Sequence, residues 1–266
     1  MSTNHYLITG GAGFIGSHLC ERLLDEGHQV TALDDLSTGA YANVGHLEGR
    51  SKFRLVIDTV LNRAIVDDLI KPVDDVFHLA SAVGVKLVID QPVKAIKTIV
   101  EGTANLLDAA ARYRKPILIT STSEVYGKGS RIPFSEDDDT VQGATSIRRW
   151  AYANAKAMDE FLALAHWHET RLPIRIVRLF NTVGPRQTGR YGMVIPRLVG
   201  QALRGDPMTV YGDGTQTRCF CHVSDVVDAL IKLIHCGSAR GRVVNIGNSE
   251  EVTIRQLAER IRQLTG

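Results

Sequence analysis

Two residues with the spacing of an acid–base pair, Tyr152 and Lys156, stand near the middle of the chain. Residues 150–168 carry a helical pattern, so a spacing of four puts both side chains on one face of a helix, one turn apart. A lysine ammonium beside a phenol favours the phenolate, which can then act as a base near neutral pH. The spacing is common by chance, so its meaning depends on what surrounds it.

A second group of reactive side chains, Thr122, Ser123 and Glu124, follows a predicted strand at residues 116–120. An ordinary polar loop has a similar composition. Next to a nucleotide site, however, hydroxyls and a carboxylate at the carboxyl end of a strand supply what a reaction centre needs. We therefore predict a catalytic set made of Thr122, Glu124, Tyr152 and Lys156.

A nucleotide site is predicted at the start of the chain, where three glycines join a strand at residues 6–8 to a helix that begins at Phe14. Gly10 permits a tight turn, Gly13 lets the backbone approach a pyrophosphate, and Gly16 lets the helix pack closely on the strand. Phe14 and Ile15 open the helix, whose N-terminal N–H groups and dipole attract phosphate.

Residues at the ends of the next strands complete the expected cofactor site. Asp34 lies 18 residues after Gly16, close to the position at which an acid binds the ribose hydroxyls and repels a 2′-phosphate. This predicts NAD rather than NADP. Asp58 is either a contact to the adenine amino group or the N-cap of a helix at residues 61–70. Ala80 is small enough for close approach of the cofactor, and His78 is expected to be structural.

The alternation of strand and helix predicts an α/β fold, a Rossmann-type doubly wound parallel sheet with a smaller C-terminal substrate-binding portion. Residues 1–180 form the NAD-binding domain. From residue 181 the alternation loosens, so residues 181–266 are expected to be mainly substrate-binding, with a segment at about 220–247 returning to the first domain.

Composition argues against several other classes of protein. A net charge of +2 does not suggest a nucleic-acid surface, and no apolar run approaches membrane-spanning length. The four cysteines follow no zinc-like spacing, and His166 and His168 would point to different sides of a helix. We therefore expect a cytoplasmic protein with reduced cysteines, no metal, no nucleic-acid partner and no membrane association.

Together these motifs resemble the extended short-chain dehydrogenase/reductases that act on nucleotide sugars. The resemblance covers the whole chain and implies an NAD-dependent enzyme with a UDP-sugar substrate. The Tyr–Lys pair argues against a non-catalytic NAD-binding regulator on the same scaffold. The markers are Gly10-Gly11-Ala12-Gly13-Phe14-Ile15-Gly16, His78-Leu79-Ala80, Tyr152 with Lys156, Arg178-Leu179-Phe180-Asn181 and Tyr211-Gly212-Asp213-Gly214.

The segment Thr122-Ser123-Glu124 separates the members of this family. Sugar-nucleotide 4,6-dehydratases typically have an aspartate where this chain has Ser123, so water elimination is poorly supported. The segment is similar to that of UDP-glucuronic acid decarboxylases, which form UDP-xylose or a UDP-4-keto-pentose. Those enzymes take an active-site arginine from a basic segment beyond the last predicted helix, and this sequence, apparently truncated there, has no such segment. A UDP-sugar 4-epimerase, acting on a hexose or a uronate, therefore stays open.

The resemblance also implies roles for single residues. Tyr152 takes the proton of the sugar 4-hydroxyl, Thr122 binds the same oxygen, and Glu124 manages a proton near C5. Helices at residues 92–112 and 150–168 are expected to form a homodimer interface. The residues expected to bind the substrate are Ser123, Asn181, Arg190, Tyr211 and Arg218.

Overall fold

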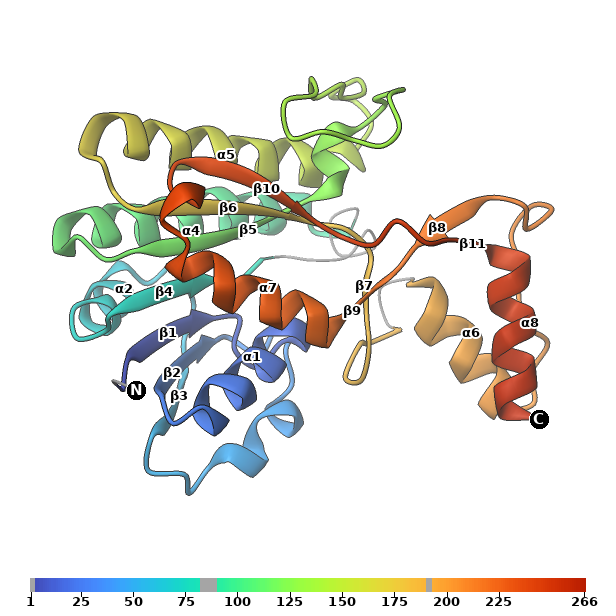
Figure 1. The fold of residues 1–266 in the computed structure, drawn as a ribbon, viewed down its shortest axis with the longest axis horizontal. Coiled ribbons are helices and arrows are strands. Elements are labelled where there is room, and N and C mark those ends of the chain that lie inside the picture. Colours follow the sequence, from blue (N-terminus) through green and yellow to red (C-terminus); the bar gives the residue numbers. More distant parts are fainter. Residues whose placement is uncertain (1–2, 82–89, 190–192) are drawn as a thin grey trace.

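The computed structural model describes residues 3–81, 90–189 and 193–266 (Figure 1). The strands are β1 (His5–Thr9), β2 (Gln29–Asp34), β3 (Phe53–Ile57), β4 (Asp75–His78), β5 (Ile117–Thr122), β6 (Ile174–Leu179), β7 (Thr182–Val183), β8 (Thr217–Cys219), β9 (Cys221–His222), β10 (Arg242–Ile246) and β11 (Glu251–Thr253). The α-helices are α1 (Phe14–Asp25), α2 (Arg63–Ile70), α4 (Pro92–Tyr113), α5 (Trp150–Thr170), α6 (Val194–Leu203), α7 (Val223–His235) and α8 (Ile254–Thr265). Short 3₁₀ turns are η1 (Tyr41–Asn43), η2 (Gly45–Leu47), η3 (Ser123–Tyr126) and η4 (Gly237–Ala239).

Seven parallel strands form the central sheet, in the order β10-β6-β5-β4-β1-β2-β3. This confirms the predicted Rossmann-type doubly wound sheet. The chain reverses direction across the sheet between β1 and β4, and in such sheets ligands bind beside the carboxyl ends of the strands at that point.

Helices cover both faces of the sheet, so neighbouring residues of one strand are both buried. On one face, Ile8 packs in a core with residues of α1 and α7 such as Leu23 and Leu230. On the other face, Leu7 packs in a core with residues of α2, α4 and α5 such as Leu107. The apolar run at the start of the chain therefore forms an interior strand.

The last third of the chain divides between the sheet and a small lobe. β10 pairs with β6 and α7 packs against α1, so both extend the first domain. Helices α6 and α8 pack through Leu198, Ala258 and Ile261, and β8 pairs antiparallel with β11. Figure 1 shows this lobe to the right of the sheet, beyond the carboxyl ends of its strands.

The predicted elements of the sheet occur within a few residues of their expected positions, but shorter strands were not predicted. Cys219 ends β8 and Cys221 begins β9, so the two thiols lie on different strands. All four cysteines are free. Among the residues described, no helix combines the length and apolar character needed to cross a bilayer.

A buried ion pair fixes α5 against the sheet. The guanidinium of Arg178 on β6 donates to both carboxylate oxygens of Glu160 on α5, at 3.0 and 2.7 Å, and both side chains are buried. Ser121 on β5 donates to the same carboxylate, and Arg178 also lies 4.7 Å from the ring centre of Tyr126. Because α5 carries Tyr152, this pair helps to set where that phenol lies.

We expect Glu160→Gln to lower the free energy of unfolding by about 3–5 kcal/mol, because it leaves the buried Arg178 guanidinium without a counter-charge. Urea unfolding followed by circular dichroism is the measurement. Glu259→Gln is the control, since Glu259 pairs with Arg262 on an exposed face of α8 and its loss should hardly matter. Equal stability of the two variants would contradict the argument.

Candidate active site

The glycine turn after β1 has no room for side chains. Gly10 has a φ of +72°, and a Cβ added there would lie 2.7 Å from the backbone nitrogen of Ala80. A Cβ on Gly16 would collide with the carbonyl oxygen of Gly10, so Gly16 lets α1 pack against the turn itself. Gly13 is the N-cap of α1 and offers no side chain to the first-turn N–H groups. Those groups are left to bind an anion, as the pyrophosphate of a dinucleotide requires.

Asp34 closes β2 beside this turn. Its carboxylate accepts from the backbone N–H of Ala12, at 2.9 Å, and from that of Leu36, at 2.8 Å. Burial raises the pKa of Asp34, and these two hydrogen bonds oppose the rise. The acid is thus held at the end of β2, where the adenosine ribose of a bound dinucleotide would lie. Phe14 and Ile15 are half-buried at the start of α1.

Of the two readings of Asp58, the helix N-cap is wrong. Helix α2 begins at Arg63, and its N-cap is Asn62, whose side chain accepts from the N–H of Ile65. Asp58 accepts instead from the N–H of Thr59, at 2.7 Å, and from the Asn62 amide. Asp58 therefore shapes the turn that leads into the cap.

The carboxyl end of β5 and the start of α5 bring four of the predicted residues together. Thr122 ends β5 and its Oγ1 accepts from the N–H of Glu124, while Ser123 and Glu124 form the first turn of η3. The Thr122 hydroxyl also lies against the phenol of Tyr152, and the charge of Glu124 acts on that phenol. Residues from β5, η3 and α5 therefore lie around the Tyr152 phenol.

The charges around Tyr152 do not have the effect expected from the sequence, which was that Lys156 favours the phenolate. Instead of being lowered, the pKa of Tyr152 is raised, first by burial and then by the negative charge of Glu124, although the Thr122 hydroxyl works in the other direction. Partial removal of water by the surrounding protein also raises the pKa of Glu124, and the positive charge of Arg149 opposes that rise. Lys156 is buried, and its Nζ lies 2.8 Å from Asp159 Oδ2.

The residues predicted to bind the substrate are more dispersed than the predicted catalytic residues. Asn181 uses its side chain to donate to the carbonyl of Cys219, at 3.1 Å, which joins the end of β6 to β8. Arg218 on β8 is exposed and donates to the Thr217 carbonyl. Tyr211 is 65% exposed, with the Arg197 guanidinium 4.3 Å from its ring centre. Arg190 lies outside the described residues.

Sequence reasoning missed three residues near the site. Arg149 and Asp159 stand three residues from Tyr152 and Lys156, and an i, i+3 search along the helix could have found both. Arg186 donates to Ser17 at 3.2 Å and pairs with Glu21 at 2.7 Å, so it ties the segment after β7 to the phosphate-facing helix α1. No spacing rule indicates that last contact.

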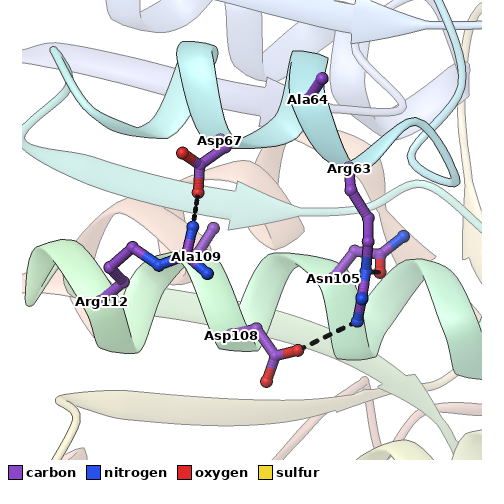
Figure 2. Close-up of a pocket in the computed structure, with 7 residues that line it drawn as sticks. All are labelled: Arg63, Ala64, Asp67, Asn105, Asp108, Ala109 and Arg112. Carbon is purple, nitrogen blue, oxygen red and sulfur yellow. Dashed lines mark hydrogen bonds and ion pairs between the residues drawn. The ribbon is translucent and has the colours of Figure 1, made fainter.

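A hollow between α2 and α4 lies away from these residues (Figure 2). Figure 2 shows two ion pairs across it, one between Arg63 and Asp108, at 3.3 Å, and one between Arg112 and Asp67. Asn105 also accepts from Arg63 at 2.7 Å. These contacts join α2 to α4. Because each cation already has an acid partner, the hollow is not a candidate for the reaction centre.

The sequence profile of the NAD dependent epimerase/dehydratase family matches residues 6–247. The chain is 45% identical to UDP-N-acetyl-alpha-D-glucosaminuronate decarboxylase of Bacillus cytotoxicus over 97% of this chain and 79% of that one. It is 40% identical to UDP-glucuronic acid decarboxylase 1 of Xenopus tropicalis over 98% of this chain, but spans only 60% of that relative. UDP-glucuronic acid 4-epimerase of Bacillus cereus, solved with UDP-glucuronic acid and NAD, superposes with a TM-score of 0.88 at 32% identity, covering 98% of this chain and 83% of that one.

We expect the protein to bind NAD⁺ more tightly than NADP⁺, because the Asp34 carboxylate repels a 2′-phosphate. Asp34→Asn should reduce this preference about tenfold, since a like-charge contact in partly screened surroundings is worth roughly 1–2 kcal/mol. Calorimetric titration with both cofactors measures it. Asp25→Asn, at the far end of α1, is the control and should leave the ratio unchanged. Equal affinity of the wild type for both cofactors would show the prediction to be wrong.

Proposed function

The chain belongs to the NAD dependent epimerase/dehydratase family, whose cofactor is the predicted NAD, and on that premise we propose that it oxidises C4 of a UDP-uronic acid and decarboxylates it. The substrate is UDP-glucuronic acid or its 2-acetamido counterpart. The observation that carries the proposal is a carboxylate, Glu124, close enough to Tyr152 for its charge to act on the phenol. Two decarboxylases that are 45% and 40% identical to the chain support it.

In the proposed reaction Tyr152 takes the proton of the sugar 4-hydroxyl. Thr122, which already lies against the phenol, binds the same sugar oxygen and holds it in line. Lys156 lies on the same face of α5 and steadies the cofactor and the phenol. Bound NAD⁺ would accept the hydride from C4 and could later return it.

Oxidation at C4 prepares the loss of the carboxylate. With a ketone at C4 the sugar is a β-keto acid, so the electrons of the bond between C5 and the carboxyl carbon can move to the C4 oxygen as CO₂ leaves. Glu124, which lies near the phenol, then supplies a proton to C5. Return of the hydride gives a UDP-pentose such as UDP-xylose, whereas early release leaves a UDP-4-keto-pentose.

A UDP-sugar 4-epimerase is the second candidate. The superposition on UDP-glucuronic acid 4-epimerase of Bacillus cereus favours it. In that reaction Tyr152 keeps its role and no carbon is lost. Glu124 would then be only a hydrogen-bond partner of the substrate.

We propose that residues 1–180, with residues 220–247, form the cofactor domain and that the rest of the chain binds the substrate. Asp58 and Ala80 would line the cofactor site, and the substrate would lie between the sheet edge and the α6–α8 lobe. The residues proposed to hold the substrate are Ser123, Asn181, Arg190, Tyr211 and, at the diphosphate, Arg218. Four free cysteines favour a reducing compartment, so we propose a cytoplasmic location.

Tyr152→Phe and Glu124→Gln should fail at different steps. Tyr152→Phe should slow the first oxidation by about 10²–10⁴-fold, so no NADH appears even transiently. Glu124→Gln should form NADH and yet release little CO₂. The measurement is labelled CO₂ from UDP-glucuronate, and from its 2-acetamido counterpart, each carrying ¹³C at C6.

The wild type decides between the two functions in the same assay. Release of labelled CO₂ from either substrate supports the decarboxylase. If the wild type releases none while the 4-epimer of the substrate accumulates, the decarboxylase proposal is wrong and the epimerase takes its place.

We further propose a homodimer formed by α4 and α5. Both helices expose large apolar side chains at i, i+3 spacing, Val93 and Ile96 on α4 and Met158 and Phe161 on α5. Phe161→Glu should convert a dimer into a monomer in light scattering at micromolar concentration. Leu264→Glu, which changes an even more exposed apolar residue on α8, should not. A monomeric wild type would contradict the proposal.

A further inference from the structure

Asp159 is a buried acid that the proposed reaction does not use. Its side chain and that of Lys156 are 1% and 3% exposed, and Lys156 Nζ lies 2.8 Å from Asp159 Oδ2. Burying either charge alone would cost several kcal/mol, so each needs the other inside the protein. The ammonium that faces the reaction centre therefore arrives with a counterion already in place.

Hydrogen bonds lead from the end of β1 toward this pair. Thr9 Oγ1 accepts from the N–H of Ala80, at 3.2 Å, and lies 2.7 Å from His78 Nδ1. Burial lowers the pKa of His78 to about 3, so the ring is neutral. His78 Nε2 lies 3.0 Å from Thr103 Oγ1, and the Thr103 hydroxyl in turn acts on Asp159.

Burial raises the pKa of Asp159, and so does the charge of Glu160, whereas Lys156 and the Thr103 hydroxyl oppose the rise. Lys156 donates to Asp159 Oδ2 at 2.8 Å, and the buried Oδ1 has no hydrogen-bond partner in the described part of the chain. Lys156 is therefore the principal partner of the carboxylate.

The charged groups around Tyr152 come from three elements. Glu124 on η3 and Asp159 on α5 both raise the pKa of the phenol. His78 on β4 is neutral, and Glu160 is occupied by Arg178. Arg149 acts on the Glu124 carboxylate, and Lys156 is paired with the Asp159 carboxylate.

We propose that Asp159 is a positioning residue, which holds the ammonium of Lys156 as its counterion and offsets the charge that Lys156 presents to Tyr152. The proposal rests on the role of Tyr152 as base in the proposed function. Tyr152 must be ionised to accept the 4-hydroxyl proton, so a raised pKa moves the acid limb of the rate profile to higher pH. Removing the Asp159 charge leaves Lys156 unopposed and should move that limb to lower pH.

The test is the rate of NADH formation in the first turnover, followed as a function of pH on the full chain loaded with NAD⁺ and mixed with UDP-glucuronate. For Asp159→Asn we expect the acid limb to shift down by about one pH unit, as loss of one charge at this range implies. A limb that coincides with that of the wild type overturns the proposal, as does a rate that falls equally at every pH.

Asp159→Ala removes the same charge with a residue that suits a helix, and it takes the place of Asp159→Asn if that variant does not fold. Glu169→Gln is the matched control, because it removes an exposed acid from the same helix about 15 Å further along its axis and should leave the limb unchanged. Tyr152→Phe separates the two proposals. If that variant forms NADH at the wild-type rate, the assignment of the base is wrong, whereas a strongly slowed Tyr152→Phe with an unshifted Asp159→Asn overturns only the role of Asp159.

Discussion

The whole arrangement depends on the absence of side chains where β1 turns into α1. A Cβ added to Gly10 would collide with the backbone of Ala80, and one added to Gly16 would collide with the carbonyl of Gly10. This crowding holds the first turn of α1 at the carboxyl edge of the sheet, with its N–H groups free of any capping side chain. Asp34 then closes the turn from β2 by accepting from Ala12. A larger residue at Gly10 or Gly16 would therefore disturb the packing of β1, α1 and β2 at this edge.

Helix α5 carries Tyr152 and Lys156 to that edge, and a buried ion pair fixes its position, since Arg178 from β6 holds Glu160. The pair of Lys156 and Asp159 lies within α5 and fixes only those two side chains. Buried pairs of this kind contribute little net stability but tolerate few alternative arrangements. The rotation of α5 about its axis and its position along the sheet are thus fixed. A reaction centre built from short side chains needs such fixed placement.

Much of this could be predicted from the sequence because it follows from period and spacing. The alternation of apolar runs with helical patterns predicted the parallel sheet, and Gly10, Gly13 and Gly16 indicated the edge where we expect the nucleotide. The two-residue strands β7 and β9 have no period to detect, since each exists only through its pairing with the other. The choice of Asn62 over Asp58 as the N-cap depended on where the turn ends, which spacing leaves open by a few residues.

The pKa of the Tyr152 phenol could not be predicted, because the sequence shows which residues are neighbours along a helix but not how deeply they are buried. From spacing, Lys156 alone acts on Tyr152 and lowers its pKa. In the fold, α4 covers this part of α5, so burial becomes the largest influence and raises the pKa of the phenol. An acid three residues from a lysine on a helix is usually a weak surface pair, worth a few tenths of a kcal/mol. Here Asp159 is enclosed with Lys156, so its charge is not screened by water and must be counted among those that decide when Tyr152 can act as a base.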